Sequence, residues 1–177
     1  MELWDIYNKD RIKTGRTISR GSDFNMGDFH LVVHACIFNS EDKLLIQQRQ
    51  PFKQGWSNMW DLTMGGSALS GESSQAALER ELAEEIGYKA DLSGIRPFFT
   101  INFPEGFDDY YLIQDDVDID GLSLQYEEVQ AVAWASLSEI LQMQKEKTFI
   151  PYHTGLLEMI FQIKSCMGAI NNSDHSL

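Results

Sequence analysis

Three glutamates are the residues of this chain whose type and spacing could do chemistry. Glu81, Glu84 and Glu85 lie in the stretch 66–88, GSALSGESSQAALERELAEEIGY, which runs from a glycine loop into a predicted helix. At about 100° per residue, the three carboxylates span an arc of roughly 100° on one helix face. Like charges four residues apart repel by roughly 0.2–0.5 kcal/mol, a cost that a bound divalent cation would reverse. Because carboxylate oxygens suit hard ions such as Mg²⁺, the spacing predicts a metal site.

The helix that would position these carboxylates has a second, apolar face. Leu78, Leu82 and Ile86 recur at i, i+4 and i+8, which predicts the side that packs on the core. Gly87 follows as a residue suited to end the helix. The plainer alternative is an acidic helix that is merely solvated.

The rest of the chain alternates strand and helix patterns, which predicts an α/β or α+β fold. The apolar run 30–38 is typical of a strand buried on both faces, and with 43–49 it predicts a hairpin over 30–49. Further strands are expected at 3–7, 59–64, 95–103, 109–114 and 129–134, and helices at 136–144 and 154–166. With no repeat or linker, residues 1–177 are expected to form a single domain.

Composition narrows the choice of partners. The formal net charge is −13, with a pI near 4.6, so a nucleic-acid polymer is an unsuitable partner. No apolar run approaches the roughly 20 residues that span a bilayer, and no secretory leader is evident, so we expect a cytoplasmic protein without membrane association. Neither of the two cysteines has motif spacing, and Cys36 is expected to be buried. A homodimer is the default expectation, because small homo-oligomers are common.

The glutamate helix resembles the signature of the Nudix hydrolases, G-x5-E-x7-R-E-U-x-E-E-x-G-U, where U is aliphatic or aromatic. Its defined positions are filled here by Gly66, Glu72, Arg80, Glu81, Leu82, Glu84, Glu85, Gly87 and Tyr88. A solvated acidic helix would explain the glutamates but not the glycines, Glu72 and Arg80 at those offsets. The resemblance implies an α/β/α sandwich around a mixed sheet.

The same resemblance implies roles for individual residues. Glu81 would be a base or metal ligand, and Glu84 and Glu85 would supply further metal oxygens. Arg80 would orient the carboxylates and Glu72 would pair with it. A backbone carbonyl of Gly65 or Gly66 would join the metal site, as would an acid outside the motif, with Glu128 preferred to Glu127.

The activity implied is the hydrolysis of a diphosphate linkage in a small anionic substrate, a nucleoside diphosphate derivative or a related organic pyrophosphate. Mg²⁺ would be the cofactor, with Mn²⁺ as a substitute. A non-catalytic nucleotide-binding module is an alternative, which the intact motif disfavours.

A second alternative comes from the stretches WDIY, HLVVHACIF, LLIQQR and GWSNMWDLTMGG. They are similar to the type I isopentenyl diphosphate isomerases, in which the segment equivalent to DLTMGG carries a catalytic cysteine and a metal-binding histidine. Met64 and Gly66 stand at those positions here, and neither can replace the lost group. Both departures favour hydrolysis, although His30 matches another isomerase metal-site histidine.

Residues outside the motif are expected to select the substrate. The candidates are Arg49, Trp56, Trp60, Arg20 and His30. The aromatic residues around loop 50–58 could equally be packing residues or a stacking surface. Arg20 belongs to a basic segment, 11–20, for which a solvated hairpin is the preferred interpretation and a phosphate-binding flap the alternative. The residues His30 and His34 are expected to be core or cleft-edge histidines rather than a zinc pair.

Overall fold

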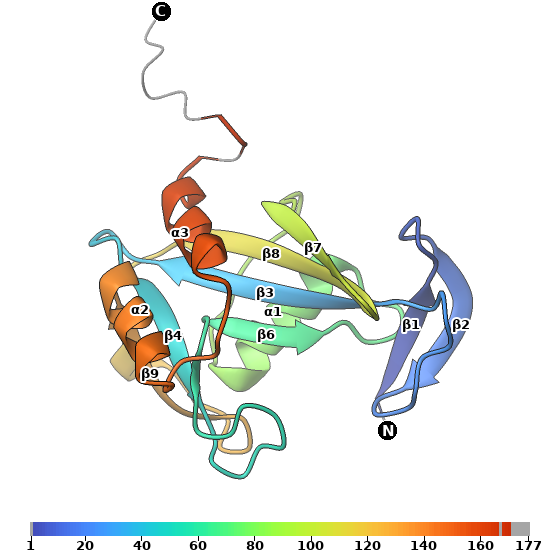
Figure 1. Cartoon of the computed structure of the whole chain (residues 1–177), viewed down its shortest axis with the longest axis horizontal. Coiled ribbons are helices and arrows are strands. Elements are labelled where there is room, and N and C mark those ends of the chain that lie inside the picture. The colour runs from blue at the N-terminus through green and yellow to red at the C-terminus, as the bar shows by residue number, and fades with distance from the viewer. Residues whose placement is uncertain (1, 167, 171–177) are drawn as a thin grey trace, which may run out of the picture.

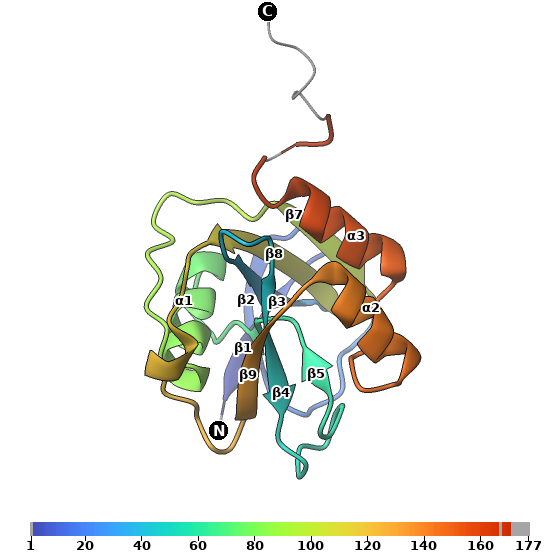
Figure 2. The same ribbon diagram turned by 90° about the vertical axis from the view of Figure 1, so that its left-hand side faces the viewer.

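The computed structural model of the chain describes residues 2–166 and 168–170. A mixed sheet separates helix α1 (Ser74–Glu85) from helices α2 (Leu137–Lys145) and α3 (Thr154–Ile163), as Figure 2 shows. One core cluster packs Leu78 and Leu82 of α1 on one face of the sheet. A second cluster packs helices α2 and α3 on the other. The predicted α/β/α sandwich is therefore confirmed. In the described part of the chain, no helix is long and apolar enough to cross a membrane.

The sheet is organised around one central strand, β3. The seven strands are β3 (His30–Phe38), β4 (Leu44–Arg49), β5 (Trp60–Asp61), β6 (Met64–Ser67), β7 (Phe99–Phe103), β8 (Gly106–Gln114) and β9 (Val129–Ala135). β3 pairs in parallel with β8 and antiparallel with β6, while β4 pairs antiparallel with β9 and β5. Residues 68–73 form the loop between β6 and α1, and the helix packs against β6 and β3, so the centre of the sheet positions the glutamate helix (Figure 1).

The predicted hairpin over 30–49 is only partly present. β3 and β4 pair at a single position, Phe38 with Leu44, and then separate. β3 instead pairs with β8 along its full length, from His30 beside Gly106 to Phe38 beside Gln114. The local turn joins the two strands, but a strand that is apolar on both faces is buried by partners from distant parts of the chain.

The N-terminal hairpin, β1 (Leu3–Tyr7) and β2 (Lys13–Ser19), forms a separate two-stranded sheet at one end of the sandwich (Figure 1). Tyr7 and Phe29 exchange two backbone hydrogen bonds of 2.7 and 3.0 Å. Arg11 donates to both carboxylate oxygens of the buried Asp109, at 3.0 and 2.8 Å. These contacts hold the hairpin against the body of the protein.

Helix α1 is capped at its start and ends just before Gly87, the residue predicted to end it. The Ser73 hydroxyl accepts a hydrogen bond from the Ala76 N–H (3.1 Å) and caps the first turn. Gly87 follows the helix with a φ of 70°, a left-handed conformation that glycine adopts without strain. The predicted apolar stripe, Leu78, Leu82 and Ile86, is fully buried. Its burial fixes the rotation of α1, and hence the direction of its glutamates.

Candidate active site

The two glycines of β6 allow side chains to approach the backbone closely. A Cβ atom on Gly66 would lie 2.4 Å from Cδ of Glu81, and one on Gly65 would lie 2.7 Å from Cε1 of His34. Both distances are shorter than normal carbon contacts, so a side chain at either position would displace its neighbour. The Glu81 carboxyl therefore lies directly against the β6 backbone.

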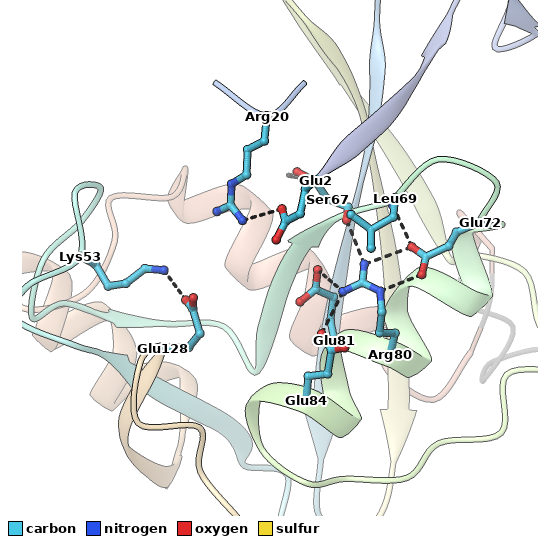
Figure 3. A network of polar contacts seen from close by, with 10 residues as sticks. All are labelled: Glu2, Arg20, Lys53, Ser67, Leu69, Glu72, Arg80, Glu81, Glu84 and Glu128. Carbon is cyan, nitrogen blue, oxygen red and sulfur yellow. Dashed lines mark hydrogen bonds and ion pairs between the residues drawn. The ribbon is translucent and has the colours of Figure 1, made fainter. Parts of the chain in front are cut away.

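Arg80 is the centre of an ion-pair network that joins α1 to the loop before it, which Figure 3 shows. Its guanidinium donates to Glu72 Oε1 (2.7 Å) and Oε2 (3.1 Å), and to the carbonyl of Ser67 (3.2 Å). It also pairs with Glu81 Oε1 (3.0 Å) and Glu84 Oε2 (3.2 Å). The predicted pairing of Glu72 with Arg80, and of Arg80 with the helix carboxylates, is present.

Loop 69–72, which carries Glu72, is held by the N-terminal hairpin. Asp5 accepts hydrogen bonds from the Ser70 hydroxyl (2.7 Å) and the Gly71 N–H (2.9 Å). Lys13 pairs with Asp5 (2.7 Å) and donates to the carbonyl of Glu72 (2.8 Å). The hairpin thus fixes the loop, the loop fixes Glu72, and Glu72 fixes Arg80.

Glu81 and Glu85 have perturbed acidity. Burial is the largest cause of a raised pKa at Glu81, and the neighbouring Arg80 opposes it only partly. Burial, followed by the charges of Glu81 and Glu128, raises the pKa of Glu85 to about 8. The pKa of Glu72 is lowered, because hydrogen bonds from Arg80 and the Leu69 N–H outweigh its burial. The nearby cations therefore do not offset the burial of Glu81 and Glu85, and both carboxyls hold their protons to a higher pH than an exposed glutamate does.

A cleft of about 550 Å³ lies over this part of α1 and β6. It brings together most residues predicted for the site: Gly65, Gly66, Arg80, Glu81, Glu84, Glu85, Glu128, Arg49, Trp56 and Arg20. Glu72 lies behind Arg80 rather than in the lining. Of Glu127 and Glu128, the two candidate acids outside the motif, Glu128 is the one in the lining.

The donors of the cleft fit a hard divalent cation. In the described ranges, no three His, Cys, Asp or Glu side chains lie close enough to enclose a metal ion as they stand. However, Glu81, Glu85 and Glu128 line one cleft. Burial, followed by the charges of Glu81 and Glu128, raises the pKa of Glu85, and a bound cation would lower it again. All three side chains offer carboxylate oxygens, the type of ligand that Mg²⁺ prefers.

Two predicted substrate-binding residues lie away from the cleft. The imidazole of His30 stacks with Trp4 and Phe24, with ring centroids at 4.7 and 4.9 Å, and its Nδ1 lies 3.0 Å from the carbonyl of Glu105. Trp60 lines a different, mostly apolar groove beside α2. Their positions support packing roles for both.

Of the four basic residues in segment 11–20, one lines the cleft and three do not. Arg11, Lys13 and Arg16 form ion pairs with Asp109, Asp5 and Asp28 that hold the hairpin, whereas Arg20 reaches the cleft and pairs with Glu2 (2.8 Å).

Several residues that line the cleft were not among the predicted site residues, although His34 was expected in the core or at a cleft edge. His34 lies beside Gly65, with Nε2 3.0 Å from Asp108 Oδ1 and its ring stacked on Tyr110. Lys53 pairs with Glu128 across the cleft from α1 (Figure 3). The pairing of β3 with β8 creates the first of these contacts, and the course of loop 50–58 creates the second. Only the second has a signal in the sequence, because Lys53 is the one basic residue of loop 50–58.

Comparison with known proteins places this geometry in a family. A model of the NUDIX domain matches residues 28–154. A Nudix hydrolase of Listeria monocytogenes is 47% identical over 165 residues, which cover 93% of this chain and 96% of that protein. An isopentenyl-diphosphate Δ-isomerase of Pectobacterium atrosepticum is 29% identical over 126 residues, or 66% of each chain.

Solved structures agree on the fold. DR0079 of Deinococcus radiodurans superposes with a TM-score of 0.72 at 21% identity, covering 89% of this chain and 98% of that one. The Nudix domain of NrtR from Shewanella oneidensis, complexed with ADP-ribose, superposes with a TM-score of 0.61 at 22% identity, covering 80% and 93%.

Proposed function

The chain belongs to the Nudix hydrolase family, and on that premise we propose that it hydrolyses a diphosphate linkage with the help of Mg²⁺. The substrate class is a nucleoside diphosphate derivative or a related organic pyrophosphate. The observation that carries the proposal is the convergence of Glu81, Glu85 and Glu128 on one cleft, where burial and mutual repulsion raise the pKa of Glu85. Mn²⁺ would serve in place of Mg²⁺ because it accepts the same oxygen ligands.

Glu84, Glu85 and Glu128 would hold the cation, together with a backbone carbonyl of Gly65 or Gly66. When bound, a divalent cation neutralises phosphate oxygens and lowers the pKa of the attacking water. Glu84 is half-exposed and faces Arg80, so it can turn toward a ligand without leaving the cleft.

Glu81 would take the proton from the attacking water. Its Oε1 pairs with Arg80, which leaves Oε2 as the oxygen that accepts the proton. A raised pKa makes this carboxylate a stronger base than an exposed glutamate. Glu72 holds Arg80 by two hydrogen bonds, so Glu81 is oriented before substrate arrives.

Arg49, Arg20 and Trp56 would contact the substrate from the cleft wall. Trp56, on loop 50–58, is half-exposed at 52%, and it lines the cleft together with Arg49 at the end of β4. An exposed aromatic ring beside cationic side chains suits a planar group attached to a diphosphate.

Isomerisation of a prenyl diphosphate receives less support. Met64, at the position expected for the isomerase cysteine, is completely buried in the core beneath α1. A thioether in that place can neither reach a substrate nor transfer a proton. We therefore favour hydrolysis, although relatives named as isomerases are among the matches.

A substrate panel tests the proposal. Nucleotide sugars, ADP-ribose, dinucleoside polyphosphates, NADH, nucleoside triphosphates and isopentenyl diphosphate would be offered with Mg²⁺ or Mn²⁺, and phosphate, nucleoside monophosphate and isomer formation would be measured. Glu84→Gln and Glu85→Gln should each reduce turnover roughly a hundredfold or more while the protein stays folded. Glu158→Gln, an exposed glutamate on α3, is the matched control. Near-normal turnover in the two site variants would refute the metal assignment, and binding without turnover would favour a nucleotide-binding module.

A further inference from the structure

Lys53 and Glu128 form an ion pair on the wall of the cleft opposite α1 (Figure 3). Lys53 comes from loop 50–58, between β4 and β5, and Glu128 immediately precedes β9. Their side chains are only 19% and 27% exposed. The pair is therefore a sheltered contact inside the cleft rather than a solvated contact on the rim.

The backbones on both sides of this pair are tied together. The Gln50 N–H donates to the carbonyl of Glu128 (3.1 Å), and its side-chain amide donates to the carbonyl of Val129 (3.3 Å). The Gln130 side chain donates to the carbonyl of Arg49 (2.8 Å). Because these bonds fix the two chain segments, the Lys53 ammonium can change partner only by rotating its own side chain.

Lys53 is also a counter-charge to the glutamate cluster. Its charge and that of Arg49 lower the pKa of Glu85, against burial and the charges of Glu81 and Glu128, which raise it. A single ammonium thus supplies part of the positive charge that a divalent cation would supply more strongly. Arg80 keeps Glu72 and Arg20 keeps Glu2 when the glutamates bind a cation, whereas Lys53 would lose its partner.

We propose that Lys53 neutralises Glu128 while the site holds no cation. Once Glu128 binds a cation, Lys53 contacts a phosphate oxygen of the substrate instead. The inference rests on the proposed function, since it takes Glu128 as a metal ligand. The ammonium is compact, carries three donors and sits on a flexible stem, so it suits two successive anionic partners better than a guanidinium would. Cation binding and substrate binding would then favour each other, because the first releases the lysine that the second uses.

Direct measurement of cation binding tests the first half. Mn²⁺ is titrated into substrate-free protein, and free Mn²⁺ is followed by electron paramagnetic resonance. Lys53→Met should lower the Kd for Mn²⁺ by about threefold or more, because a competing positive charge has been removed. In a Glu128→Gln background the same substitution should tighten Mn²⁺ binding less than it does in the unaltered protein, because only the effect of the Lys53 charge on Glu85 remains. Arg20→Met removes an equal charge from the cleft and should change the Kd less than Lys53→Met does.

The second half is tested with pyrophosphate. In the presence of saturating Mg²⁺, calorimetry should show that Lys53→Met binds Mg²⁺-pyrophosphate about threefold or more weakly than the unaltered protein. Circular dichroism and thermal unfolding confirm that each variant is folded. An unchanged affinity for either ligand, or equal tightening of Mn²⁺ by Arg20→Met, would overturn the inference.

These outcomes are distinguishable from a failure of the proposed function. If Glu84→Gln and Glu85→Gln leave Mn²⁺ affinity unchanged, the metal site itself is refuted. If those variants weaken Mn²⁺ binding and Lys53→Met does not tighten it, only the role given to Lys53 is refuted. If Glu128→Gln alone has no effect on Mn²⁺ affinity, the helix carboxylates keep their assignment and the inference fails.

Discussion

Gly66→Ala should separate the catalytic geometry of this protein from its stability. The added Cβ would lie 2.4 Å from Cδ and 2.5 Å from Oε1 of Glu81. Ordinary carbon contacts need roughly 3.5–4.0 Å, so the carboxyl must retreat by about 1 Å. The carboxyl is the far end of a flexible side chain, and its retreat costs little folding free energy. A displacement of about 1 Å at a reacting group can reduce the rate by roughly a hundredfold.

The assay compares turnover and unfolding of the same preparations. Turnover of the best substrate from the panel should fall about a hundredfold, while the Tm changes by less than about 3 °C. Gly155→Ala is the matched control, because a Cβ on Gly155 would meet nothing within 4 Å. Normal turnover in Gly66→Ala would refute the placement of Glu81. A large loss of Tm with proportionate loss of activity would show that Gly66 serves folding instead.

Three further changes have expected outcomes. Gly65→Ala should lower the free energy of unfolding, measured in urea, by roughly 1–3 kcal/mol, because its methyl would lie 2.7 Å from the packed ring of His34; a loss under about 0.5 kcal/mol would contradict this. With a chelator present to remove metal ions, the Tm should fall as the pH rises from about 5 to about 8. The pKa of Glu85 is raised to about 8 in the native protein, so the native state keeps a proton that the unfolded chain releases at lower pH. Glu85→Gln should reduce the dependence of the Tm on pH, and an unaltered dependence would count against a raised pKa at Glu85. Asp5→Ala should accelerate amide exchange in loop 69–72 and reduce turnover about tenfold, and unchanged exchange would exclude the hairpin's role.

Local patterns predicted the helix and its cap correctly because their causes are local. The stripe Leu78, Leu82 and Ile86 has a helical period, and all three residues are fully buried. The helix predicted at 136–144 is also present as α2, where Ser136 forms a capping box with Glu139. In both cases, residues within a few positions of each other decide the structure.

Contacts between distant segments could not be predicted in the same way. The parallel register of β3 with β8 puts His34 and Asp108 together, and the sequence holds no local signal of that register. His30 is also a histidine of β3, four residues before His34, yet it packs among aromatic rings outside the cleft. Strand pairing is settled by the whole core, so side chains that meet across strands had to be located in the structure.

The N-terminal hairpin has a practical consequence for anyone who makes this protein. The family-matched region starts at residue 28, so a fragment cut at that boundary would keep the whole signature and lose the contacts that fix its loop. The carbonyl of Leu3 accepts a hydrogen bond from the Ser70 N–H (2.7 Å), and Glu2 lines the cleft. An affinity tag or fusion partner joined ahead of Glu2 would therefore start beside the candidate active-site cleft, and should be placed at the other end of the chain or removed before any assay.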